Sequence, residues 1–108
     1  MSLFYHKFLR PLLFKLDPEQ AHEIACNLLS VAERFRISKL LARSFFRTET
    51  APTELMGLTF PNCVGQAAGL DKDGRFPGMS SSLGFGHVEV GTVTPKGQPG
   101  NPCPRLFR

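Results

Sequence analysis

The sequence predicts a protein of the α/β class, with a helical arm over residues 1–47 and the opening of a parallel α/β domain over residues 48–108. Large apolar residues recur at helical spacing through the first half of the chain. The second half follows the order strand, polar turn, helix, strand, polar turn, which is typical of parallel α/β folds. With 108 residues, the chain is long enough for one small domain.

The composition favours a folded protein with an uneven charge. Apolar residues make up 42% of the chain and include ten phenylalanines, which excludes disorder for most of it. The formal net charge is +4, and much of the basic charge lies in the first half, at Lys7, Arg10, Lys15, Arg34, Arg36, Lys39, Arg43 and Arg47. Such an arm is a solvated helix face, a surface that lies on anionic lipid, or a nucleic-acid patch. Because Phe and Leu alternate with the basic residues, we expect no nucleic-acid partner.

The cysteines and histidines give no metal signature. Cys26, Cys63 and Cys103 are far apart and lack C-x-x-C spacing, so reduced thiols in a cytosolic compartment are expected. His6, His22 and His87 are scattered, without acidic partners at ligand spacing. Basic residues interrupt the apolar N-terminus, and no run approaches the roughly 18 apolar residues of a spanning helix. Any membrane contact is therefore expected at the surface.

Three amphipathic helices are expected in the arm. The first carries Phe4, Phe8 and Leu12 at four-residue spacing. The second begins at Asp17, because an aspartate can cap free backbone N–H groups and Pro18 needs no donor at the first helical position. Gln20 occupies the reciprocal position of a capping box. The apolar stripe of this second helix is Ala21, Ile24, Ala25, Leu28, Leu29 and Ala32.

The third helix is expected to be capped by Ser38 and to end near Arg47. Three short helices cannot bury all of these apolar side chains against one another. Two interpretations follow: the stripe packs on the body of the protein, or the arm lies at an interface and its groove admits a lipid-soluble molecule. Periodicity alone does not choose between them.

The second half begins after a polar break at residues 48–53. Two very short strands are expected around a turn at Gly57, followed by a compact buried strand over residues 63–68. A weak helix over residues 75–83 and a second strand over residues 87–94 complete the unit. Glu89 falls within that second strand, which is expected to be buried, and we assign it no catalytic role.

Two polar turns, residues 67–74 and 91–96, are expected on the same side of the sheet, where parallel folds carry their chemistry. Ala68 and Gly69 would let a ring or phosphate approach the backbone closely. Lys72 offers a positive charge for an anionic substrate or a reduced cofactor ring, and Thr92 offers a hydroxyl. The alternative is that this is a solvated turn whose aspartates hold the lysine or cap the next helix. Neither a P-loop nor a G-x-G-x-x-G fingerprint is present.

Several motifs in register resemble the N-terminal part of the dihydroorotate dehydrogenases. They are Met-Gly-Leu-Thr-Phe at 56–60, Ala-Ala-Gly-Leu-Asp-Lys-Asp-Gly at 67–74, Gly-Phe-Gly at 84–86, Glu-Val-Gly-Thr-Val-Thr-Pro at 89–95, Gln-Pro-Gly-Asn at 98–101 and Pro-Arg-Leu-Phe-Arg at 104–108. The arm, with Leu-Asp-Pro-Glu-Gln-Ala-His at 16–22, is similar to that of the membrane-associated, quinone-dependent class.

The resemblance implies an FMN-binding (β/α)8 barrel, of which this chain would hold the first two β/α units. Such an enzyme oxidises dihydroorotate to orotate in pyrimidine synthesis and passes the electrons through FMN to ubiquinone or menaquinone. It also implies that residues 1–47 form the quinone tunnel and lie peripherally on the cytoplasmic side of the inner membrane. The residues that would contact FMN are Ala68, Gly69, Leu70, Asp71, Lys72 and Thr92, with Lys72 also near the substrate.

The chain departs from the family pattern at Cys63, where proline is frequent, and at Gln66, where an apolar residue is usual. A barrel of eight units takes about 250 residues, so we expect an N-terminal fragment whose catalytic base lies beyond Arg108. Alone it would not hold FMN tightly. Two alternatives remain: a membrane-surface binding module without activity, and a flavin-binding barrel with another substrate.

Overall fold

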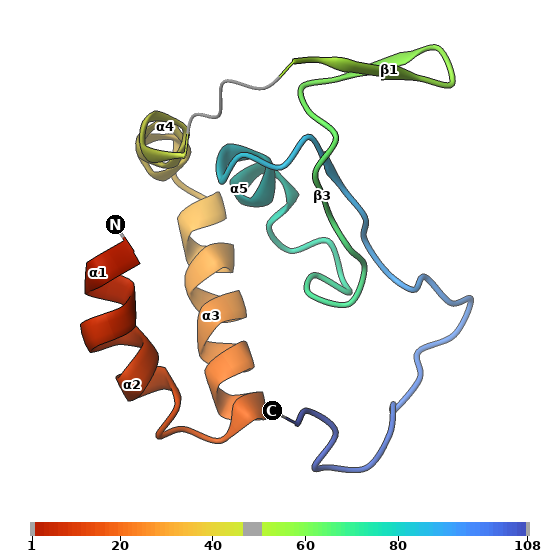
Figure 1. The fold of residues 1–108 in the computed structure, drawn as a ribbon. Helices are drawn as coiled ribbons and strands as arrows, with labels where there is room; N and C mark the ends of the chain where they lie inside the picture. The colour runs from red at the N-terminus through yellow and green to blue at the C-terminus, as the bar shows by residue number, and fades with distance from the viewer. Residues whose placement is uncertain (1, 47–50, 108) are drawn as a thin grey trace.

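The computed structural model describes residues 2–46 and 51–107 (Figure 1). A helical first half leads into a small mixed second half, followed by an extended segment without helix or strand from residue 89 to residue 107. The order confirms a mixed helix and sheet protein in which a helical segment comes first. The expected helix end at Arg47 and the first half of the polar break, residues 48–50, lie outside the described residues.

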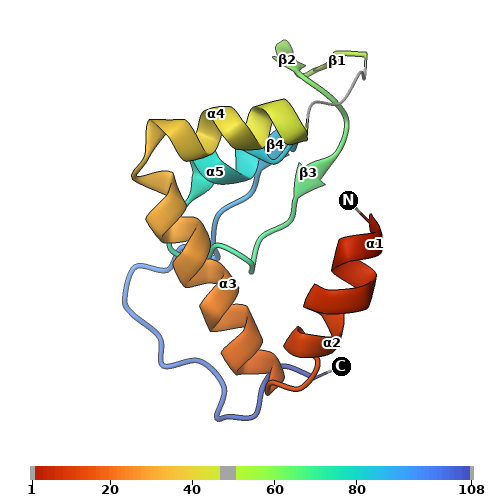
Figure 2. The same cartoon turned by 90° about the vertical axis from the view of Figure 1, so that its left-hand side faces the viewer.

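The N-terminal segment is one continuous helical stretch made of α1 (Ser2–Phe4), the π-helix η1 (Tyr5–Leu9) and α2 (Arg10–Leu13). The π-helical turn ends two residues before Pro11, which has no N–H to donate back to the preceding turn. The Phe4 and Phe8 rings stack with centroids 5.7 Å apart. None of the residues in η1 or α2 is buried, and in Figure 2 this segment diverges from the next helix in an open V.

The long helix α3 (Pro18–Glu33) begins where the sequence predicts. Asp17 accepts a hydrogen bond from the Glu19 N–H at 2.9 Å, and Pro18 takes the first helical position. The predicted stripe of α3 is only partly covered, because Leu29 and Ala32 pack on the core whereas Ile24 and Leu28 are exposed.

Helix α4 (Arg36–Phe45) starts earlier than predicted. Phe35, in extended backbone conformation, is its N-cap residue and makes no side-chain cap. Ser38 lies inside the helix, so the expectation that it caps this helix is wrong. The turn from α3 into α4 is short, and α4 begins directly after the extended residue Phe35.

The core lies where α5 (Pro77–Ser82) meets the arm. Cys26 of α3, Ala42 of α4 and the pair Phe76 and Met79 at α5 are buried together, with Leu83 packed beside them. Helix α5 contacts α3, α4 and the strand β4. It is the element that joins the helical half to the sheet, as both views show (Figures 1 and 2).

The strands β1 (Thr53–Leu55) and β2 (Leu58–Phe60) form an antiparallel hairpin around Met56 and Gly57, which confirms the predicted turn. The strands β3 (Gly65–Gln66) and β4 (His87–Val88) pair in parallel, with Gly65 opposite His87 and Gln66 opposite Val88. Helix α5 connects them, as a parallel crossover requires.

Both parallel strands are shorter and more exposed than predicted. Val64 is 58% exposed and Val93 is 82% exposed, and Glu89 is also exposed, so the expectation of buried strands is wrong for these residues. Burial of a parallel strand needs cover on both faces, and among the described helices α5 is the one that contacts β4. Gln66 is 5% exposed, and its Nε2 has no partner in the described part of the chain.

Two side chains fix the β3–β4 pair. The buried Asn62 donates from Nδ2 to the Gly84 carbonyl at 2.9 Å and accepts from the Val64 N–H at 2.9 Å. The imidazole of His87 lies directly over Gly65, where any Cβ would collide with the ring, and Phe60 packs edge-on against it at 5.6 Å. Position 65 therefore has room only for glycine.

Candidate functional site

The loop from residue 67 to residue 76 follows β3 and is shaped by Asp71. This aspartate is 1% exposed. Its Oδ1 accepts from the Arg75 N–H at 2.7 Å and its Oδ2 accepts from the Phe76 N–H at 2.9 Å. Both carboxylate oxygens are thus engaged by backbone, and the helix α5 begins directly after these two residues, two residues later than predicted.

Lys72 faces away from Asp71. It is exposed, and no hydrogen bond or ion pair engages its ammonium among residues 2–46 and 51–107. Ala67 and Ala68 beside it are exposed, and Gly69 adopts a φ of +103° in a turn with open space at its Cβ position. The loop presents small residues and one unpaired cation, as the sequence predicts.

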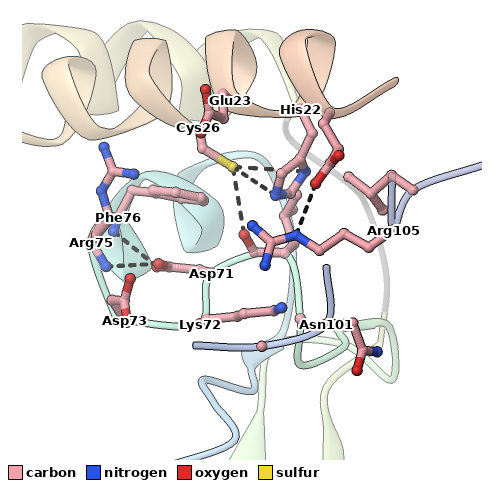
Figure 3. A pocket seen from close by; sticks show the side chains of 15 residues that line it. His22, Glu23, Cys26, Asp71, Lys72, Asp73, Arg75, Phe76, Asn101 and Arg105 are labelled. Atoms are coloured by element: carbon pink, nitrogen blue, oxygen red, sulfur yellow. Dashed lines mark hydrogen bonds and ion pairs between the residues drawn. The ribbon is translucent and has the colours of Figure 1, made fainter. Parts of the chain in front are cut away.

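A cleft of about 480 Å³ lies between this loop, the first half of α3 and the extended segment near residue 101 (Figure 3). The α3 side is lined by Glu19, His22, Glu23 and Cys26; the loop side by Gly69, Leu70, Asp71, Lys72, Asp73, Arg75 and Phe76; the extended segment by Gly100, Asn101, Arg105 and Leu106. Three regions distant in sequence therefore share one concave surface.

Cys26 joins the arm to the loop at the back of the cleft. Its Sγ donates to the Leu70 carbonyl at 3.5 Å and lies 3.6 Å from Nε2 of His22, one helical turn away on α3 (Figure 3). Burial raises the pKa of the Cys26 thiol, while the nearby Arg75 guanidinium acts in the opposite direction. The thiol is therefore neutral near pH 7 and serves as a packed, weak donor.

Two further contacts tie α3 to the walls of the cleft. Arg75 donates from Nη2 to Oδ1 of Asn27 at 2.7 Å. Arg105 donates from Nε to Oε1 of Glu19 at 2.8 Å, and this bond raises the pKa of the guanidinium. The same Glu19 oxygen accepts from the exposed thiol of Cys103 at 3.4 Å and raises the pKa of that thiol.

The cleft brings together some of the predicted site residues. Gly69, Leu70, Asp71 and Lys72 line it, whereas Ala68 and Thr92 are exposed outside it. Sequence reasoning assigned no role at this cleft to His22, Cys26 and Arg105. A signal for the first two was present, because residues 19, 22 and 26 share one face of a helix. No group of three or more His, Cys, Asp or Glu side chains in the described ranges is placed to hold a metal ion.

The cleft mixes both signs of charge, but most of its charges are already engaged. Asp71 bonds to backbone, Glu19 pairs with Arg105, and Arg75 bonds to Asn27. Among the described residues that line the cleft, the ammonium of Lys72 has no hydrogen bond or ion pair, and it could meet an anionic ligand. The carboxylates of Glu23 and Asp73 also line the cleft without such a bond in the described part of the chain.

Comparisons with known proteins agree on one family. The family model for dihydroorotate dehydrogenase matches residues 50–108. The chain is 51% identical to the dihydroorotate dehydrogenase (quinone) of Methylococcus capsulatus over 106 residues, which are 98% of this chain and 30% of the relative. It is 55% identical to the protein of that name from Teredinibacter turnerae, over 95% of this chain and 30% of the relative.

A third protein of that name, from Delftia acidovorans, is 48% identical over 100% of this chain and 30% of its own length. The chain thus spans about 30% of the length of these curated relatives, in a match that includes both the helical arm and the loop that carries Lys72. The chain belongs to the dihydroorotate dehydrogenase family.

Proposed function

We propose that this chain supplies the quinone-side arm and the first flavin-contacting loop of a quinone-dependent dihydroorotate dehydrogenase. The complete enzyme oxidises (S)-dihydroorotate to orotate in pyrimidine biosynthesis and transfers the electrons to ubiquinone or menaquinone. The names of the relatives, which match along the arm as well as the loop, support this assignment. The parallel β3–α5–β4 unit supports residues 48–108 as the start of a (β/α)8 barrel.

The observation that carries the proposal is the shared cleft. A lipid-soluble acceptor must come close to the flavin, so the element that admits the acceptor and the loop that holds the flavin must border one space. Here α3 of the arm and the 67–76 loop line the same cleft, and Cys26 bonds across to Leu70. We therefore propose that residues 1–47 form the quinone side of the site.

The residues of the loop suit FMN binding. Small, exposed residues at Ala68 and Gly69 leave room for a planar ring, and the free ammonium of Lys72 suits negative charge on the reduced ring or a substrate carboxylate. Thr92 offers an exposed hydroxyl after the second strand. When bound, FMN supplies a two-electron acceptor that can be reoxidised by a quinone.

Among the proposed contact residues, Leu70 would act through its backbone near the loop turn, and Asp71 by shaping the loop, because its carboxylate is fully engaged. We assign the proton-abstracting base to none of the described residues.

The arm is also proposed to rest peripherally on the cytoplasmic face of the inner membrane. Its helices expose large apolar side chains, including Phe4, Phe8 and Leu12. Within the described ranges, the helices are too short or too polar to cross a bilayer.

The direct test is Lys72→Ala in the full-length flavoprotein, with Lys96→Ala as the matched control, because Lys96 is also an exposed lysine in a turn outside the cleft. Loss of the cation should lower kcat/KM for dihydroorotate-dependent quinone reduction by roughly 100-fold, while the control retains its rate. A Lys72→Ala protein with unchanged flavin content and unchanged rate would overturn the assigned role. A parent protein that binds flavin but does not oxidise dihydroorotate would overturn the proposed function.

A further inference from the structure

The carboxylate of Glu33, the last residue of α3, joins three helices. Its Oε2 accepts a hydrogen bond from the backbone N–H of Met79, in the first turn of α5. From α4, Lys39 donates to Oε1 of Glu33 at 3.0 Å and to the Glu33 carbonyl at 2.8 Å. Only 23% of the Glu33 side chain and 27% of the Lys39 side chain are exposed. The contact is thus half-buried and held from both sides.

Gly78 makes this approach possible. A Cβ at Gly78 would lie 2.6 Å from Oε1 of Glu33, closer than such atoms can pack. The backbone at Gly78 does not adopt the left-handed conformation that favours glycine, so an added Cβ acts only through the space that the Glu33 carboxylate occupies. A larger residue would push the Glu33 side chain away from the start of α5.

The contact reaches the site through a short stretch of backbone. Asp71 holds the N–H groups of Arg75 and Phe76, and Glu33 holds the N–H of Met79 three residues later. Asp71 of the loop therefore holds the middle of the segment 71–79, and Glu33 of the arm holds its end. Glu33 itself does not line the cleft, so any effect on the site passes through α5.

We propose that Glu33, oriented by Lys39, is a positioning residue that holds the Lys72 loop at its working distance from α3. Its carboxylate fixes the position of the first turn of α5 relative to the arm. The loop that ends at α5 is thereby held opposite α3 across the cleft. The catalytic consequence rests on the proposed function, whereas the structural consequence does not.

Hydrogen exchange at single amides tests the structural part. Glu33→Ala should accelerate exchange at Met79 and, if the contact positions the loop, also at Arg75 and Phe76, by about tenfold. Gly78→Ala should do the same while leaving both charged partners in place. Glu54→Ala, which removes an exposed carboxylate from β1, should leave these amides unchanged.

Glu33→Gln serves where Glu33→Ala fails to fold, because the amide oxygen can still accept from Met79 but binds Lys39 less strongly. A smaller acceleration at the same three amides is expected. Acceleration confined to Met79, with Arg75 and Phe76 unchanged in every variant, would show a local helix cap and overturn the proposal.

Kinetics on the full-length flavoprotein test the catalytic part. Displacement of the loop should reduce kcat for quinone reduction severalfold more than it changes the KM for dihydroorotate in Glu33→Gln and Gly78→Ala. Equal rates in the parent and in both variants would overturn the positioning role. A parent without dihydroorotate oxidation would refute the proposed function instead, and the exchange data would still decide whether Glu33 positions the loop.

Discussion

Asp71 and Lys72 are adjacent in the chain and face opposite sides of the loop. The carboxylate of Asp71 is buried and accepts two backbone N–H bonds, whereas Lys72 is exposed and unpaired in the described part of the protein. Hydrogen bonds to a charged group are each worth about 1.5–3 kcal/mol, so the bonds to Asp71 are strong enough to define the loop. Asp71 therefore bonds to the loop that leads into α5 and does not hold Lys72, and the helix itself has no side-chain cap.

Cys103 provides a prediction at the scale of one residue. Its bond to Glu19 raises the pKa of the thiol, and only the thiolate reacts with an alkylating reagent. A raised pKa lowers the fraction of thiolate at a given pH below that pKa. The alkylation rate of Cys103 should therefore rise at a higher pH than that of a thiol without such a bond. Glu19→Ala should shift the profile to lower pH and accelerate alkylation of Cys103 at pH 8 severalfold, as measured by mass spectrometry with iodoacetamide.

The exposed Cys63 in the same protein is the internal control, because it does not bond to Glu19. Its rate should be the same with and without Glu19. An equal acceleration at Cys63 and Cys103 would point to general loosening, and no acceleration at Cys103 would contradict the hydrogen-bond origin of the shift.

Among the elements, those whose boundaries depend on nearby residues are the ones that sequence predicts well. The start of α3 is set by the cap of Asp17 and by Pro18 at the first helical position. The turn at Gly57 also depends on nearby residues alone. The start of α4 is not predictable in this way, because the extended residue Phe35 precedes the helix and Ser38 lies inside it. The start of α5 is not predictable from nearby residues either, because it follows two residues whose N–H groups bond to Asp71.

The candidate site also has one part that nearby residues predict and one part that they do not. The small residues and the lysine of the loop are visible in the sequence, because a lysine among small residues directly after an apolar run is an unusual combination. The opposite wall is not visible, since His22 and Arg105 come together only after α3 and the extended segment have folded beside the loop. The exposure of Val64 and Val93 was missed because burial depends on covering layers that periodicity does not report.

The β1–β2 hairpin gives a prediction at the scale of one element. Met56 and Gly57 both have positive φ, at 54° and 75°, a conformation that methionine disfavours and asparagine tolerates. Met56 is 92% exposed, so little packing is lost on substitution. Met56→Asn should stabilise the protein by on the order of 0.5–1 kcal/mol in urea unfolding.

Met56→Val is the matched comparison, because a β-branched residue resists positive φ more strongly. It should destabilise the protein. If the two variants unfold at the same urea concentration, the backbone strain assigned to Met56 is wrong.

At the scale of the whole molecule, one small apolar cluster and several polar bonds join the halves. The core is a small cluster around Cys26, Ala42, Phe76 and Met79, whereas many large apolar side chains of the arm face outward. Contacts that involve Glu19, Asn27 and Glu33 link α3 to the second half. An arm attached by one face can present its other face to an apolar surface.

Vesicle binding tests that consequence. The full-length protein should co-sediment with anionic vesicles at low salt, and Phe8→Asp should weaken binding by about tenfold because it removes one large apolar side chain from the interface. Phe8 is 66% exposed on the arm, and Leu55→Asp is the control, since Leu55 is 58% exposed on the hairpin. Equal losses in the two variants, or no binding by the parent, would contradict a membrane-facing arm.

The imidazole over Gly65 also bears on how the chain avoids mispairing while it folds. Two strands of two residues each carry few backbone bonds with which to reject a shifted alignment. A shift by one position would bring Val64 or Gln66 under His87, and either side chain would have to displace a ring that Phe60 holds in place. The correct alignment is thus selected by one vacant Cβ position, and an error there would turn the following loop, with Lys72, to the wrong face.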